Sequence, residues 1–378
     1  MDTMKKSFFL IVAVMAVLSC HENNSGPALL DPADFKGEID GEEVALYTLK
    51  AGDITLQATN YGARVATLLT PDRKGEYADI VVGRKSLDGY VNPQGERFLG
   101  ACVGPVANRI GGASFTIGDE TYTLPANDNE VNTLHGGFKG LDHVVWDVKE
   151  VTDSTLTLTY LHADGQEGFP GNLLIEMTYA VTAANEFRIT YLATTDKPTH
   201  VNLTNHPFFN LKGEGEGTIL GHEMYINASH FIPIDKLSIP TGEVAPVVGT
   251  PMDFREIHTI GERIDAPFDQ LQNGHGYDHN WCLDREGDGL ELACTVYEPE
   301  TGRFLEVLTD QPGLQFYSGN FFDGNDFGKN GKPLGFRSSL ALETQKWPDS
   351  PNHPDFPSTL LNPGETYTQI CVYRFSTK

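Results

Sequence analysis

Short stretches in which side-chain character alternates every two residues recur along this chain, and they constrain its fold more than any other feature. Thr155 to Tyr160 alternates threonine with leucine and tyrosine, while Leu173 to Val181 and Phe187 to Leu192 are period-two or apolar runs. Successive side chains of a β-strand point to opposite faces of a sheet, so this pattern is typical of half-buried strands. Ser114 to Ile117 and Thr121 to Leu124 flank Gly-Asp-Glu, which predicts a hairpin.

Turn residues separate these runs, and no long stretch has helical periodicity. The 39 glycines and 22 prolines are spread along the whole chain, which indicates ordered loops between many short strands. We therefore predict an all-β sandwich or barrel, in one domain from about Phe35 to Lys378.

The N-terminal residues predict export. Lys5 and Lys6 precede an apolar run from Phe8 to Leu18, which is typical of a secretory signal over residues 1–20 and shorter than the ~20 residues that cross a bilayer. The run ends Val-Leu-Ser-Cys, which resembles the lipobox of bacterial lipoproteins, so we expect lipidation of Cys20 and a periplasmic or outer-membrane-anchored protein. Ordinary signal cleavage beside an unrelated cysteine is the alternative. Residues 21–34 are interpreted as a flexible tether.

The net charge and the cysteine content limit the binding partners and metal sites that the chain is expected to have. The formal net charge of −25 repels phosphate backbones and argues against nucleic acid as a partner. We interpret the acidity as a solvated surface. Cys102, Cys282, Cys294 and Cys371 form no C-x-x-C pair, so neither a zinc site nor a particular disulfide is indicated.

His206 is the first candidate catalytic residue. It precedes Pro207 within the run Val201 to Leu211, and the proline favours extended backbone before it. Its imidazole can exchange protons near neutral pH, and Phe208 and Phe209 can shield it from water. Taken alone, a histidine here also fits a hydrogen-bonded core residue.

Glu343 is the second candidate. It lies in the short apolar strand predicted over Ala341 to Gln345, where poor hydration raises a carboxyl pKa toward that of a useful general base. An exposed strand position is the alternative.

Three further segments carry polar groups suited to a ligand. Asn108 and Arg109 precede a glycine pair, His135 precedes Gly-Gly, and Asp278 follows Gly-Tyr. An arginine fork can bind a sugar hydroxyl or a carboxylate, and an aspartate can accept hydrogen bonds from a sugar diol. Structural ion pairs and turn caps are the alternatives for the same residues.

Together these segments resemble the aldose 1-epimerase (galactose mutarotase) family, in order and almost end to end after the signal. The matching motifs are Asn60-Tyr61-Gly62-Ala63, Leu134-His135-Gly136-Gly137, Thr204-Asn205-His206-Pro207-Phe208-Phe209-Asn210-Leu211, Ile239-Pro240-Thr241-Gly242-Glu243, Gly249-Thr250-Pro251-Met252-Asp253-Phe254-Arg255, Gly276-Tyr277-Asp278-His279, Leu342-Glu343-Thr344-Gln345 and Leu361-Asn362-Pro363-Gly364-Glu365-Thr366-Tyr367.

The resemblance implies a large antiparallel β-sandwich with an open sugar-binding cleft, a catalytic domain over residues 35–378, and a reaction that needs no cofactor or metal. It implies that Glu343 is the general base and His206 the general acid. It further implies sugar-binding roles for His135, Asp278, Arg109 and, more weakly, Asn108, Gln315 and Tyr277.

The sequence departs from the family pattern at two positions. Many relatives have arginine where this chain has Pro105, and a small polar residue where it has Pro207. Neither change removes a predicted catalytic group, but Pro105 leaves the charge near the cleft undecided.

The expected reaction interconverts the α and β anomers of a free aldose such as glucose or galactose. A carboxylate takes the proton of the anomeric hydroxyl while an imidazolium gives one to the ring oxygen, the ring opens, and it closes on the other face. Two alternatives use the same residues: a glycoside hydrolase with Glu343 and Asp278 as its carboxyl pair, and a non-catalytic sugar-binding lipoprotein. We expect a monomer or a weak dimer.

Overall fold

The computed structural model describes residues 28–378. The predicted signal, Cys20 and residues 21–27 of the predicted tether lie outside the described residues, so these assignments stay predictions. Within residues 28–378, no helix combines the length and apolar character that crossing a bilayer requires.

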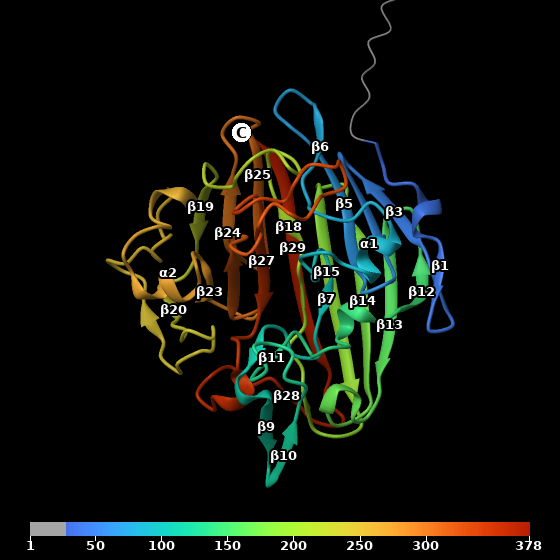
Figure 1. The fold of residues 1–378 in the computed structure, drawn as a ribbon, viewed down its shortest axis with the longest axis vertical. Coiled ribbons are helices and arrows are strands. Elements are labelled where there is room, and N and C mark those ends of the chain that lie inside the picture. Colours follow the sequence, from blue (N-terminus) through green and yellow to red (C-terminus); the bar gives the residue numbers. More distant parts are fainter. Residues whose placement is uncertain (1–27) are drawn as a thin grey trace, which may run out of the picture.

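A nine-stranded antiparallel sheet forms one layer of the molecule (Figure 1). Its strands, in spatial order, are β12 (Asp147–Val151), β13 (Thr155–His162), β14 (Leu173–Val181), β15 (Glu186–Thr195), β29 (Tyr367–Thr377), β25 (Arg303–Thr309), β24 (Glu291–Tyr297), β19 (Glu223–Ile226) and β22 (His258–Thr259).

Two smaller antiparallel sheets complete the sandwich. The six-stranded sheet has the order β18 (Phe208–Phe209), β27 (Leu340–Gln345), β26 (Gly313–Tyr317), β23 (Asp278–Cys282), β20 (His230–Ile232) and β21 (Ala245–Pro246). The four-stranded sheet has the order β3 (Leu46–Ala51), β4 (Ile54–Thr59), β5 (Arg64–Pro71) and β6 (Tyr77–Asp79).

Short elements connect these sheets. The helices are η1 (Pro32–Phe35), α1 (Leu87–Val91), η2 (Gly111–Ala113), η3 (Leu141–His143), η4 (Gln166–Gly168), η5 (Ile260–Glu262), α2 (Asp269–Asn273) and η6 (Ser350–Asn352). The two-stranded pairs are β1 (Gly37–Ile39) with β2 (Glu42–Val44), β9 (Ser114–Ile117) with β10 (Glu120–Thr123), β8 (Arg109–Ile110) with β11 (Thr133–Leu134), β7 (Cys102–Val103) with β17 (Thr204–Asn205), and β16 (Thr199–His200) with β28 (Leu360–Leu361).

The predicted all-β sandwich is confirmed, and the alternating runs become β13, β14 and β15, with the predicted hairpin as β9 and β10. In β14 every second residue is buried. This burial explains the alternation, because one face of the sheet covers the core.

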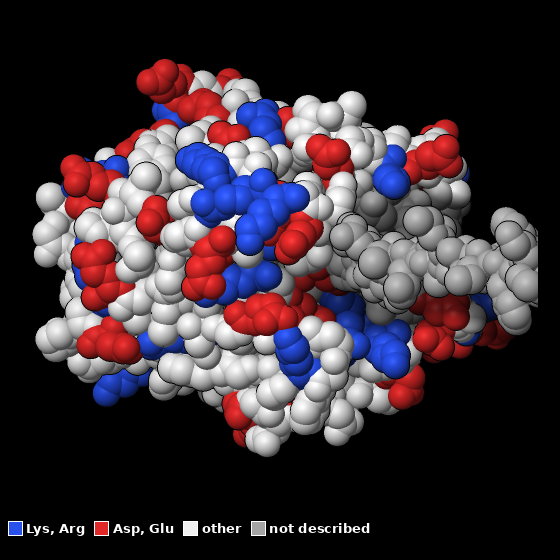
Figure 2. Space-filling view, turned by 90° about the horizontal axis from the view of Figure 1, so that it is seen from above, with Lys and Arg blue, Asp and Glu red and all other residues white. Residues whose placement is uncertain are grey.

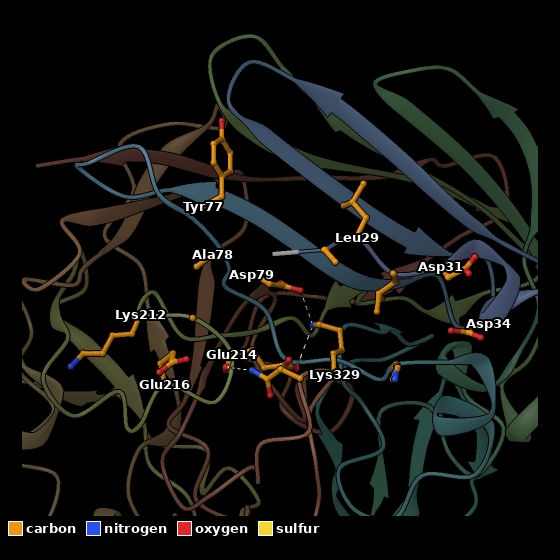
Figure 3. Close-up of a pocket in the computed structure, with 15 residues that line it drawn as sticks. Leu29, Asp31, Asp34, Tyr77, Ala78, Asp79, Lys212, Glu214, Glu216 and Lys329 are labelled. Carbon is orange, nitrogen blue, oxygen red and sulfur yellow. Dashed lines mark hydrogen bonds and ion pairs between the residues drawn. The ribbon is translucent and has the colours of Figure 1, made fainter. Parts of the chain in front are cut away.

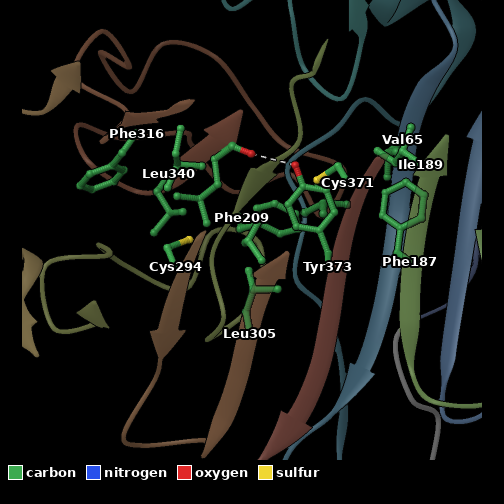
Figure 4. Packing of buried hydrophobic residues seen from close by; sticks show 14 of the residues in the cluster. Val65, Phe187, Ile189, Phe209, Cys294, Leu305, Phe316, Leu340, Cys371 and Tyr373 are labelled. Carbon is green, nitrogen blue, oxygen red and sulfur yellow. Dashed lines mark hydrogen bonds between the residues drawn. The ribbon is translucent and has the colours of Figure 1, made fainter. Parts of the chain in front are cut away.

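The core lies between the nine-stranded sheet and the two smaller sheets, and Figure 4 shows part of it. The ring of Tyr373 on β29 lies 5.2 Å from that of Phe209 and 5.9 Å from that of Phe187. Its hydroxyl donates a 2.8 Å hydrogen bond to the carbonyl of Leu342. Because Leu342 faces this core, the next side chain, Glu343, faces the opposite side of β27.

The remaining sequence features fit this arrangement. Cys102, Cys282, Cys294 and Cys371 are buried free thiols that take part in the core. On the face seen in Figure 2, acidic and basic side chains are interspersed, as expected for a solvated surface.

Candidate active site

Strand register sets His206 opposite Glu343. Strands β18 and β27 pair antiparallel with Phe208 opposite Ala341, and two residues further along the same register His206 meets Glu343. The His206 Nε2 and Glu343 Oε1 atoms lie 3.4 Å apart, and both side chains are more than nine-tenths buried. The two residues are called the catalytic pair below.

Backbone hydrogen bonds fix the histidine. The N–H of His206 donates to the carbonyl of Ala101 at 2.8 Å, and its carbonyl accepts from the N–H of Gly100 at 2.9 Å. The ring of Phe208 packs 4.7 Å from the imidazole. Phe209 does not shield it, contrary to our prediction, because alternate residues of β18 face opposite ways and Phe209 packs in the main core.

Neighbouring strands of the same sheet bring Gln315 and Asp278 to the site. Gln315 on β26 is paired with Glu343, and Asp278 on β23 is paired with Tyr317. Gln315 Nε2 donates a 2.7 Å hydrogen bond to Asp278 Oδ1. Glu343 Oε2 and Gln315 Oε1 are buried and have no hydrogen-bond partner within the described chain, so both can accept from a ligand hydroxyl. Tyr277, in contrast, packs in the main core and its hydroxyl donates to the carbonyl of Pro251, so it does not join the site.

His135 is held by a reciprocal pair of hydrogen bonds with Asn108. The N–H of Asn108 donates to His135 Nδ1 at 3.1 Å, and the N–H of His135 donates to the carbonyl of Asn108 at 2.9 Å. Both residues have positive φ, 60° and 51°. Gly136 must be glycine, because its φ is +87° and a Cβ there would lie 1.9 Å from the carbonyl oxygen of Gly104.

These contacts decide the tautomer of His135. Since Nδ1 accepts a backbone N–H, the neutral ring carries its proton on Nε2 and presents a donor. His135, His206 and Glu343 have potential ligand atoms within 4.8 Å of one another, which is a spacing that a metal ion can use. A metal-binding histidine, however, donates a hydrogen bond through its other nitrogen. His135 accepts one there, so the arrangement fits a hydrogen-bond donor better than a metal ligand.

Arg109 reaches the cleft already paired. Its Nε donates to Asp128 Oδ2 at 3.0 Å, and both side chains are 13% exposed. A second guanidinium, that of Arg97, contacts Asp142 at 2.7 Å and the carbonyl of Gly137 at 3.3 Å.

One cleft of about 110 Å³ collects these side chains. Its lining consists of Glu96, Phe98, Asn108, Arg109, Leu134, His135, His206, Asp278, Tyr317, Phe321 and Glu343. All the predicted catalytic and sugar-binding residues line it except Tyr277 and Gln315, and Gln315 donates a hydrogen bond to Asp278. Sequence reasoning missed Glu96, Phe98, Tyr317, Phe321 and Asp128. Glu96 and Asp128 lie in loops, where no periodicity marks them.

Burial dominates the electrostatics of the catalytic pair. Burial, then the charges of Asp278 and Glu96, raise the pKa of Glu343 well above its ordinary value, as the sequence predicted. Burial lowers the pKa of His206 to about 4, and it holds the pKa of His135 well below its ordinary value. Burial thus disfavours the charged form of both groups. Transfer of one shared proton from Glu343 to His206 would create the carboxylate and the imidazolium without a change in net charge.

A larger hollow of about 640 Å³ lies elsewhere, lined by Tyr77, Lys212 and Lys329 among others (Figure 3). Within it, Lys329 Nζ lies 3.2 Å from Asp79 and 3.4 Å from Glu214.

Comparison with known proteins gives a consistent result. The family model described as aldose 1-epimerase matches residues 45–374. The chain is 42% identical to galactose mutarotase of Mus musculus over 336 residues, 89% of this chain and 95% of that protein. It is 37% identical to aldose 1-epimerase of Escherichia coli K12 over 340 residues, 89% of this chain and 96% of that protein.

Solved structures agree. A GalM/aldose epimerase homologue from C. elegans superposes with a TM-score of 0.81 at 28% identity, covering 88% of this chain and 99% of that one. Galactose 1-epimerase from Lactobacillus acidophilus superposes with a TM-score of 0.79 at 27% identity, covering 91% and 97%.

Proposed function

The chain belongs to the aldose 1-epimerase family of isomerases and is a mutarotase, and we propose that Glu343 and His206 exchange the protons of its reaction. The observation that carries this proposal is the 3.4 Å approach of His206 Nε2 to Glu343 Oε1 inside one buried cleft. The two groups come from adjacent strands in register, so their separation is fixed before a sugar binds.

Opening the pyranose ring requires one proton to leave and one to arrive. In the form with a carboxylate and an imidazolium, Glu343 takes the proton of the anomeric hydroxyl while His206 gives its proton to the ring oxygen. The bond from the anomeric carbon to the ring oxygen breaks, and an aldehyde forms. After rotation about the bond between the first two carbons, the reverse transfers close the ring on the other face. Each acid or base group typically contributes ~10² to 10⁴ in rate.

The other cleft residues hold the sugar. His135 donates through Nε2 toward the ring oxygen, where negative charge develops as the bond breaks. Asp278, oriented by Gln315, accepts from sugar hydroxyls, and Arg109, oriented by Asp128, donates to them. Asn108 acts through His135, because its backbone N–H fixes that ring.

Polarimetry of freshly dissolved α-glucose or α-galactose tests these assignments. We expect the wild-type protein to accelerate the approach to equilibrium, and Glu343→Gln and His206→Asn to lower kcat by ~10² to 10⁴ each. Glu214→Gln is the matched control, because Glu214 is a buried glutamate beside Lys329 that does not line the cleft.

Other outcomes would contradict the assignment. A Glu343→Gln variant that keeps wild-type kcat would exclude Glu343 as the base. Sugar binding without acceleration would indicate a binding protein, and release of reducing ends from an oligosaccharide would indicate a hydrolase.

We also propose that the protein is exported and anchored through a lipid on Cys20, as a monomer or weak dimer. Lys5, Lys6 and the apolar run to Leu18, followed by Ser19-Cys20, support this proposal. Mass spectrometry of the mature protein from its own host should find diacylglycerol on an N-terminal Cys20, and Cys20→Ser should release the protein from membranes. A mature protein that begins elsewhere, or that retains residues 1–20, would refute the anchor. Light scattering tests the oligomeric state.

A further inference from the structure

Glu96 is a carboxylate in the cleft that the proposed reaction does not use. Its side chain lines the cleft together with Asp278 and Glu343. The N–H of Phe98 donates to Glu96 Oε1 at 2.9 Å, which fixes the carboxylate relative to the phenylalanine ring that packs 4.6 Å from His135. Glu96 is therefore held in place beside the sugar-binding residues.

No cation of the described chain neutralises Glu96 by direct contact. The nearby Arg84 donates to the backbone carbonyl of Glu96 at 3.1 Å, but its charge is taken by Asp326, with which it forms a two-pronged ion pair. No lysine, arginine or histidine nitrogen of residues 28–378 lies within 4.0 Å of the Glu96 carboxylate.

The cleft as a whole has an excess of acidic groups. Three of its lining side chains are carboxyls, Glu96, Asp278 and Glu343, and one is a guanidinium, Arg109. The charge of Arg109 is already balanced by Asp128. A cation in this cleft therefore meets more carboxyl groups than positive groups, and the low local dielectric strengthens its attraction to them.

We propose that Glu96 makes the cleft selective for the charge of the aldose, so that it accepts cationic 2-amino-2-deoxyhexoses as well as neutral hexoses and rejects anionic hexuronates. The inference rests on the proposed function, which places the anomeric carbon beside Glu343. The substituent on the next carbon of the ring must then lie inside the same acidic cleft. An ammonium there is attracted by the carboxyls of Glu96 and Asp278, whereas the carboxylate of a hexuronate is repelled by them.

The test compares kcat/KM for glucose, glucosamine and glucuronate in wild-type protein and in Glu96→Gln, at about pH 6.5 so that the amine is protonated, with the spontaneous rate subtracted. We expect Glu96→Gln to lower the ratio of glucosamine to glucuronate by about tenfold and to change glucose by less than about twofold. Asp88→Asn is the matched control. It removes one negative charge from the exposed surface of α1, and it should leave the ratio unchanged.

An unchanged ratio in Glu96→Gln would overturn the proposal. An equal fall for all three sugars would also overturn it, because it would make Glu96 a residue that binds a shared hydroxyl or maintains the fold. The same change in Asp88→Asn would assign the selectivity to the net charge of the whole protein instead. Failure of the proposed function looks different, since wild-type protein would then not accelerate glucose at all.

Discussion

Replacing the buried His162 should make the protein less sensitive to acid. His162 ends β13, opposite Leu173, and is 1% exposed. Neither ring nitrogen has a hydrogen-bond partner, and the ring packs edge-on to Phe169 at 6.0 Å. Burial without a partner lowers its pKa to about 4 from the ordinary 6.5.

The sign and size of this effect of pH on stability follow from proton linkage. The unfolded chain binds a proton at this histidine near pH 6.5, whereas the folded chain binds it only near pH 4, so acid favours unfolding. The contribution of His162 to stability is fully present above about pH 6.5 and is lost as the pH falls toward 4. Between pH 8 and pH 5 the loss from this one group is about 2 kcal/mol, a large part of the ~5–15 kcal/mol that stabilises a typical domain.

The assay is urea unfolding of wild-type protein and His162→Leu at pH 8 and at pH 5. Leucine can cost packing energy, but that cost is present at both pH values and cancels in the difference. We expect the free energy of unfolding to fall by about 2 kcal/mol less in His162→Leu than in wild type. His230→Leu, at an exposed position on β20, should behave as wild type. Equal losses in His162→Leu and wild type would refute the reasoning.

Three further predictions follow from the site and its supports. The rate of mutarotation should show a broad pH plateau over the range in which the catalytic pair holds one proton. The lower limit of the plateau lies near pH 4, where the imidazole also protonates, and the upper limit lies at the raised pKa of the glutamate. A single-limbed profile centred near pH 6.5 would contradict this prediction. Asp128→Asn should raise KM about tenfold with little change in kcat, since it releases Arg109 but not the catalytic pair; steady-state kinetics would refute it if kcat fell instead. Asp142→Asn should lower the free energy of unfolding by about 3 kcal/mol, because it leaves the fully buried guanidinium of Arg64 without its counter-charge at 3.6 Å. The measurement is urea unfolding at pH 7, and an unchanged free energy of unfolding would contradict this prediction.

Strands were predictable from the sequence where one face covers the core. The alternation in β13 and β14 records which side chains are buried, so their bounds could be read to within about two residues. The row that joins His206, Glu343 and Gln315 could not be derived from local pattern. Register between strands distant in sequence depends on tertiary packing, and only the family resemblance grouped these residues.

Loop residues and protonation states were harder to predict from the sequence. Glu96 and Asp128 have no periodic signal, and their roles depend on which charges surround them in space. For Glu343 the apolar neighbours in sequence gave the right direction of the pKa shift. The same burial acts on His206 in the opposite sense, because it disfavours the charged form of either group. The sequence showed the apolar strand around the acid and two phenylalanines after the histidine, but it did not show how fully the imidazole is enclosed.

The opposite pKa shifts of Glu343 and His206 favour catalysis. A solvated glutamate and histidine at pH 7 would exist mainly as a carboxylate and a neutral imidazole, and that pair has a base but no proton to give. Burial of both groups within 3.4 Å of each other raises the pKa of the glutamate and lowers that of the histidine, which favours a pair that shares a single proton. Mutarotation requires one donor and one acceptor at the same moment, in either direction, and a pair with one shared proton provides both. The proton can move between the two groups without a change in net charge, so the enclosed cleft does not have to stabilise an additional charge when the roles exchange.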